Sequence, residues 1–132
     1  MLKIVKTSIA IATASLIFAG NAQADVGEAL QNICTIVKAD DKSELRKKIK
    51  AAHTNYRLKL KEYYSGISCG GNSLIRTAML SGSVNIGVLL IKKIPKRDLK
   101  AKEVDGKTLT EWAIENGFAE STIMLALNNR IN

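Results

Sequence analysis

The most chemically suggestive segment of this chain is the sequence GISCG at residues 66–70, which matches the G-x-S-x-G pattern around nucleophilic serines. That pattern works only on a sharp strand-to-helix turn within a large parallel sheet, which a chain of 132 residues with few strand-like segments does not provide. A serine nucleophile also needs a base, and His53 is the only histidine. His53 follows a basic segment, where a histidine usually caps carbonyl groups or faces water. We therefore expect no catalysis by Ser68.

Paired carboxylates are the second candidate for chemistry. Glu111 and Glu115 lie one helical turn apart, and Glu120 follows. Glycoside hydrolysis needs two such groups facing each other across a cleft, but Glu111 is better placed to cap its own helix. No histidine and cysteine cluster has the spacing of a metal site, and no glycine-rich loop is accompanied by a phosphate-binding lysine. The sequence predicts a non-enzymatic protein without metal or cofactor.

The first 24 residues have the features of an export signal. Lys3 and Lys6 precede an apolar run over residues 8–19, and the small residues Ala22 and Ala24 fit a signal-peptidase site. We therefore expect cleavage after Ala24, a periplasmic location and a single helical domain over residues 25–132.

Two cysteines follow this segment, Cys34 and Cys69. Their spacing excludes a C-x-x-C redox motif and a four-ligand zinc site. An even number of cysteines in an oxidising compartment favours a disulfide, which would stabilise the fold by roughly 3–4 kcal/mol. Free thiols or an intermolecular bridge are the alternatives.

Basic residues are concentrated in the first half of the domain. The chain has a formal charge of +8, and residues 42–61 contain eight basic residues against the single acid Glu44. Three tyrosines accompany them, a combination that can bind anionic lipid or lipopolysaccharide; nucleic acid is not expected as a partner. The alternatives are a solvated face and tyrosines packed against the first helices. The predicted binding surface consists of Arg46, Lys47, Lys50, Arg57, Lys59, Lys61, Tyr63 and Tyr64.

The elements that must position these residues are helices. Apolar spacing predicts helices over 28–39, 43–52, 73–80, 84–93 and 119–129, and a Thr108–Glu111 capping box opens another that ends at Gly117. Alternation of Tyr56, Leu58 and Leu60 with basic residues hints at an extended piece within 53–69. Residues 96–104 are expected to form a basic loop.

A weak internal repeat links these helices. A shift of 35 residues places Gly71, Ser73, Leu74, Ala78 and Gly82 on Gly106, Thr108, Leu109, Ala113 and Gly117. Over residues 28–130 the pattern resembles the ankyrin repeat, which implies an all-α stack of about three helical hairpins. It departs from that family because neither unit has the usual proline and because the segment 53–69 is long. Chance similarity of two hairpins is the alternative.

The whole chain also resembles a family of short exported bacterial proteins of unknown function. The cysteine in the first helix and the stretch SCGGNSL at residues 68–74 carry this likeness. It implies a shared small domain with paired cysteines and implies no activity.

Together these features predict a protein-interaction module that engages another envelope protein in the periplasm. The alternative is a basic-surface binder of anionic envelope components, either lipid or lipopolysaccharide. Salt separates the two, because a contact driven by charge weakens steeply as salt rises.

Overall fold

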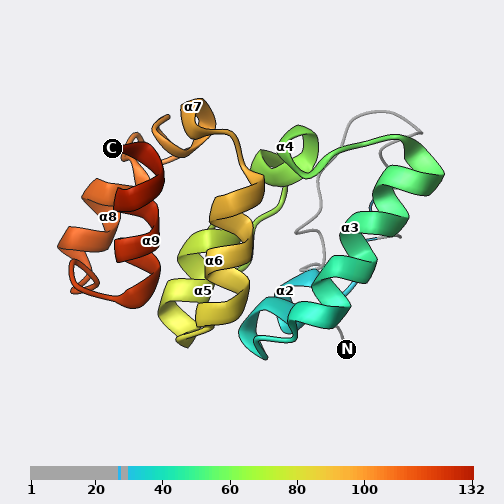
Figure 1. Ribbon diagram of the computed structural model, residues 1–132, viewed down its shortest axis with the longest axis horizontal. Coiled ribbons are helices and arrows are strands. Elements are labelled where there is room, and N and C mark those ends of the chain that lie inside the picture. The colour runs from blue at the N-terminus through green and yellow to red at the C-terminus, as the bar shows by residue number, and fades with distance from the viewer. Residues whose placement is uncertain (1–26, 28–29) are drawn as a thin grey trace, which may run out of the picture.

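The computed structural model describes residue 27 and residues 30–132 (Figure 1). The predicted signal peptide, residues 1–24, lies outside the described residues. The described part of the chain is helical and contains no strand, only an isolated bridge between Cys69 and Asn72. This confirms the prediction that the fold is all-α. No helix in the described part is both long and apolar enough to cross a membrane.

The elements follow one another along the chain without long gaps. They are α2 (Ile33–Lys38), α3 (Lys42–Tyr56), α4 (Leu60–Tyr63), the 3-10 turn η2 (Tyr64–Gly66), α5 (Leu74–Ser81), α6 (Val84–Lys93), α7 (Lys96–Leu99), α8 (Leu109–Glu115) and α9 (Thr122–Ile131).

Three successive helix pairs lie side by side in Figure 1: α2 with α3, α5 with α6, and α8 with α9. The first members of the pairs contact one another in the order α2, α5, α8, and the second members in the order α3, α6, α9. The apolar faces of all six helices therefore meet in one continuous core, which includes Leu30, Leu45, Leu74, Leu90, Leu109 and Leu127.

The turn inside each pair is closed in the same way. Asp40, Gly82 and Gly117 adopt left-handed backbone conformations, with φ of 55°, 67° and 84°. In each case the next residue donates its N–H to a carbonyl of the first helix, which ends that helix and reverses the chain. These bonds are Asp41 N to Ile36 O at 3.1 Å, Ser83 N to Ala78 O at 2.8 Å, and Phe118 N to Ala113 O at 2.7 Å.

Two segments differ from the expectation of extended or irregular chain. Helix α3 runs on to Tyr56, and α4 begins at Leu60, so that only three residues separate the two helices. The Glu62 carboxylate accepts the N–H of Lys59 at 2.7 Å, a local cap that starts α4. The predicted basic loop over 96–104 contains α7, which Leu99 anchors in the core. The alternation around Leu58 and Leu60 therefore reflects a helix break and not a strand.

Candidate functional site

The disulfide fixes the loop that leads into α5. Cys34 on α2 is bonded to Cys69 with an S–S distance of 2.06 Å, which confirms the predicted pair. Within the loop, Cys69 and Asn72 exchange two backbone hydrogen bonds of 2.8 and 3.2 Å. The Ser68 hydroxyl accepts the N–H of Gly71 at 3.0 Å. Residues 67–73 therefore form a constrained turn beside the second helix pair.

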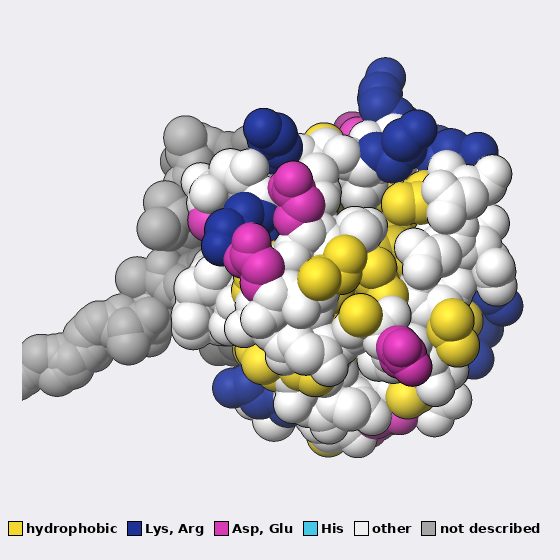
Figure 2. Space-filling model, turned by 90° about the vertical axis from the view of Figure 1, so that its left-hand side faces the viewer, with side chains coloured by type: hydrophobic (Ala, Val, Ile, Leu, Met, Phe, Trp, Pro, Cys, Tyr) yellow, Lys and Arg dark blue, Asp and Glu magenta, His cyan; other side chains and the backbone are white. Residues whose placement is uncertain are grey.

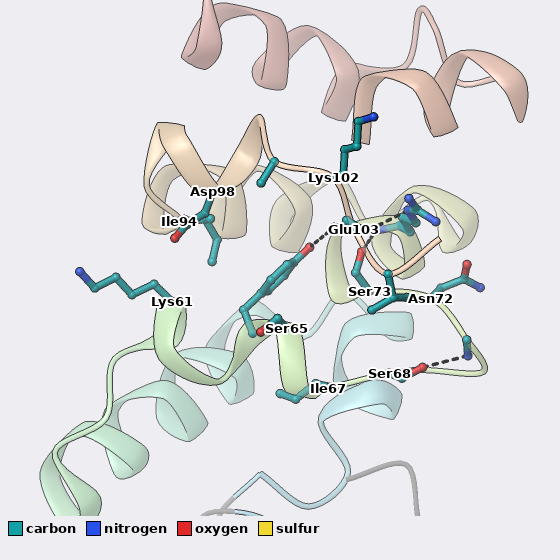
Figure 3. Close-up of a pocket in the computed structure, with 15 residues that line it drawn as sticks. Lys61, Ser65, Ile67, Ser68, Asn72, Ser73, Ile94, Asp98, Lys102 and Glu103 are labelled. Atoms are coloured by element: carbon teal, nitrogen blue, oxygen red, sulfur yellow. Dashed lines mark hydrogen bonds and ion pairs between the residues drawn. The ribbon is translucent and has the colours of Figure 1, made fainter. Parts of the chain in front are cut away.

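This turn is one wall of a pocket with a volume of about 400 Å³ (Figure 3). The segment of α4 and η2 forms a second wall, and the chain from the end of α6 through α7 to Val104 forms the third. The side chains that line the pocket include Lys61, Tyr64, Ser68, Asn72, Lys102 and Glu103.

A buried arginine on α5 organises the back of the pocket. The side chain of Arg76 is only 4% exposed, and its guanidinium binds Asp105 through two contacts of 2.7 and 3.0 Å. Its Nε lies 2.7 Å from Glu103 Oε1, and the two form an ion pair whose geometry is not that of a hydrogen bond. One Nη donates a hydrogen bond to the carbonyl oxygen of Lys107 at 3.3 Å. The guanidinium also lies 5.1 Å from the Trp112 ring centre, within cation–π range.

The electrostatics of this cluster follow from its contacts. The hydrogen bonds from Arg76 lower the pKa of Asp105 to about 2, and the same bonds raise the pKa of Arg76. Burial raises the pKa of Glu103, and the positive charge of Arg76 opposes that shift. The arginine is therefore permanently charged, and its charge is compensated within the protein.

Tyr64 joins this cluster to the pocket wall. Its hydroxyl accepts the N–H of Ile75 at 3.3 Å and donates to Glu103 Oε2 at 3.4 Å. Burial and the nearby Glu103 charge raise the pKa of Tyr64 above its ordinary value. The Tyr64 hydroxyl reaches Glu103 from the pocket wall formed by α4 and η2. The ring position is therefore set at its hydroxyl end.

The predicted basic surface divides in the structure. Lys61 and Tyr64 line the pocket, whereas Arg46, Lys47 and Lys50 are exposed on α3 and are not among its lining residues. Arg57 and Lys59 are exposed between α3 and α4. Tyr63 corrects the prediction, because it is 2% exposed and belongs to the core. Burial raises the pKa of Tyr63 to about 12.

The candidates for catalysis do not come together. Ser68 lines the pocket, but His53 is exposed on α3 and is not among the lining residues. Glu115 pairs with Lys107, and Glu111 caps α8 by accepting the N–H of Thr108 at 2.9 Å. Within residues 27 and 30–132, no three histidine, cysteine, aspartate or glutamate side chains gather as a metal site.

Arg76, Glu103 and Asp105 belong to the site, although the sequence patterns do not predict them as site residues. Arg76 is the one charge in the helical sequence LIRTAMLS, which is otherwise apolar or uncharged and short. A charge in such a helix needs a buried partner, since an unpaired one is costly. A lone arginine in an apolar helix therefore indicates that acidic partners exist. It does not indicate which acids they are, and the two partners of Arg76 lie 27 and 29 residues away along the chain.

Comparison with known proteins identifies a family for this chain. The sequence model of a family described as "Protein of unknown function (DUF3718)" matches residues 33–101, which include both cysteines and Arg76. Neither the curated proteins nor the solved structures provide a match.

Proposed function

The chain belongs to the DUF3718 family, for which no function is described, and we propose that it is a non-enzymatic interaction module that binds a segment of another protein. The binding site in this proposal is the pocket between α4, α7 and the loop 67–73. The observation that carries it is a pocket whose back wall is already held by Arg76, Glu103 and Tyr64.

The size and lining of the pocket suit binding. A volume of about 400 Å³ lies within the usual range of ligand sites. Tyr64, Ala101 and Val104 supply apolar surface, and Ser68 and Asn72 supply hydroxyl and amide groups that can pair with a peptide backbone. Because the surrounding segments are constrained by the disulfide and by the Arg76 cluster, little ordering entropy is lost on binding.

The charges in the pocket favour binding over catalysis. Glu103 is the most buried acid at the site, with a side chain 16% exposed, and both of its oxygens have partners. A general acid or base needs a carboxylate that is available to substrate. Here the carboxylate serves to compensate Arg76 and to orient Tyr64.

Export to the periplasm is part of the same proposal. The Cys34–Cys69 disulfide supports it, because such bonds persist in oxidising compartments. The stacked helix pairs support an interaction role, since repeat arrays of the ankyrin kind present extended surfaces to partners.

The second candidate function is binding of anionic envelope lipid or lipopolysaccharide by the outer face of α3. Arg46 and Lys50 are exposed there, and the only acid of this helix, Glu44, pairs with Lys47 at 3.3 Å. A net positive helix face of this kind attracts anionic surfaces.

A photo-cross-linker at Val104, which is 93% exposed at the rim of the pocket, tests the first candidate in envelope extract. We expect a discrete protein adduct that persists at high salt and that Ala101→Trp abolishes by filling the pocket. Ala119→Trp is the matched control, because Ala119 is also exposed and lies outside the pocket.

An adduct unaffected by Ala101→Trp contradicts the pocket as the binding site. Binding of anionic lipid or lipopolysaccharide that is lost at high salt, and that is also lost in Arg46→Glu/Lys50→Glu, supports the second candidate instead.

A further inference from the structure

We propose that the segment bound in this pocket is an extended peptide with an apolar side chain between two acidic residues. This inference rests on the proposed function and names the chemistry of the partner. It follows from three features of the pocket: its apolar walls, the charge of Arg76 that is already compensated within the protein, and two lysines at its rim that come from different elements.

The apolar walls define the anchor. Ile67 and Ile94 line the pocket but are only 3% and 1% exposed, so the apolar surface open to a ligand comes from the less buried lining residues Tyr64, Ala101 and Val104. The position of the Tyr64 ring is fixed by its two hydroxyl contacts, to Glu103 and to the backbone N–H of Ile75. An aliphatic or aromatic side chain gains most from this environment, because it removes apolar surface from water on both partners.

The back of the pocket has no uncompensated charge that would attract a charged group of the ligand. Arg76 contacts Glu103, Asp105 and the carbonyl of Lys107, so its positive charge is matched within the protein. A ligand carboxylate placed there would have to compete with two acids that already occupy the guanidinium. The charge preference of the site is therefore set at the rim, where the lining acid Asp98 is already paired with Arg97 at 3.6 Å.

Two cations occupy the rim on different elements. Lys61 is on α4 and Lys102 follows α7, and both are exposed. Within the described residues, neither forms an ion pair of 4 Å or less. Figure 3 shows the two side chains extending in different directions, Lys61 to the left from α4 and Lys102 upward from the chain after α7. Each is therefore available to pair with an acid of the ligand.

This divergence distinguishes an extended ligand from a single headgroup. One phosphate or carboxylate is bound best by cations that converge on it. Cations that diverge pair instead with two acids separated along a chain, with the segment between them crossing the pocket. An acidic peptide meets that requirement, and its backbone pairs with Ser68 and Asn72.

The wider charge distribution favours the same partner. Lys92, Lys93, Lys96 and Lys100 are exposed along the segment that leads to Lys102. Figure 2 shows Lys and Arg side chains gathered along the upper edge of the molecule, where α7 lies in Figure 1. A field of this sign accelerates encounter with acidic segments and disfavours basic ones.

Selection of random dodecapeptides on the oxidised protein tests the inference. We expect enriched peptides to carry an apolar residue flanked by Asp or Glu, and to lose binding in Ala101→Trp. For one selected peptide, Lys61→Glu/Lys102→Glu weakens affinity about tenfold or more, measured by fluorescence anisotropy. The matched control Lys47→Glu/Lys50→Glu, with the same charge change on α3, retains most of the affinity.

Three results overturn the inference. Enrichment of neutral or basic peptides contradicts the acidic preference, yet leaves the interaction module intact if the Val104 adduct still forms in envelope extract. Failure to enrich any peptide contradicts a peptide ligand in the same way. Pocket-dependent binding of vesicles containing equal amounts of phosphatidylglycerol and phosphatidylcholine, abolished by Ala101→Trp, assigns the pocket to anionic lipid.

Discussion

The carboxylate of Asp40, in the turn between α2 and α3, caps the helix α6 of the next pair at Ile86. Its Oδ1 accepts the N–H of Ile86 at 2.8 Å, and its Oδ2 accepts the side-chain N–H of Asn85 at 3.0 Å. Ser83, at the N-cap position of α6, makes no side-chain cap bond of its own. The first pair is therefore joined to the second by a helix cap supplied across 46 residues of sequence.

Replacement of Asp40 should weaken that junction. Asp40→Ala removes the cap and places alanine at φ 55°, so we expect a loss of about 1–2 kcal/mol in the free energy of unfolding, measured in urea. Asp40→Asn keeps an acceptor oxygen and tolerates the left-handed backbone, and it should cost less. Equal losses in the two variants would contradict the cap.

A second junction depends on the absence of a side chain. Gly87 on α6 faces α9, and a Cβ at that position would lie 2.5 Å from Ile123 Cδ1 and 2.7 Å from Cγ1. Gly87→Ala is expected to destabilise the fold by about 1–3 kcal/mol through overpacking, although alanine is the better helix former. Thermal denaturation followed by circular dichroism measures the change.

The double variant Gly87→Ala/Ile123→Val isolates this contact. Valine lacks the Cδ1 atom that the new methyl group meets, so the pair should recover part of the loss in a double-mutant cycle. Additive losses would show that the two positions do not limit the approach of α6 and α9.

The Arg76 cluster predicts a dependence of stability on pH. Because the pKa of Asp105 falls from 3.8 to about 2 on folding, its contribution is complete above about pH 4 and is lost as pH falls through about 2. Asp105→Asn should therefore lower the urea midpoint at about pH 6 and narrow the gap between the midpoints at about pH 6 and pH 2.5. An equal difference between the two urea midpoints in the variant and in the parent protein would refute this role of Asp105.

The features foreseen from sequence are those set by residues close together in the chain. The caps of α5 and α8 need only a hydroxyl and an amide three residues away, and Ser73 and Thr108 both form them. The turn glycines Gly82 and Gly117 likewise act locally, through the left-handed backbone they adopt. The same locality explains the correct assignment of α6 between Ser83 and Pro95.

The features missed are those that depend on distant contacts. Arg76 acquires its role only when the chain brings Glu103 and Asp105 to it, and no spacing rule specifies that pairing. Tyr63 was placed on the surface because its neighbours Lys59 and Lys61 are basic, yet a short helix turns it into the core while leaving Lys61 exposed. The pocket is formed by three segments that are separated along the chain, and no sequence motif within any one of them predicts it.

Reduction of the disulfide should affect stability and binding together. Opening the bridge between Cys34 and Cys69 removes a cross-link over a sequence separation of 35, worth about 4 kcal/mol in the chain-entropy model. It also releases the turn that carries Ser68 and Asn72 into the pocket. We expect a lower melting temperature and a weaker Val104 adduct under reductant, with Cys34→Ser/Cys69→Ser matching the reduced protein and insensitive to reductant.

Unchanged melting on reduction would refute the stabilising role. A lower melting temperature with an undiminished adduct, measured well below that temperature, would show that the pocket keeps its form without the bridge, held by the Arg76 and Tyr64 contacts alone.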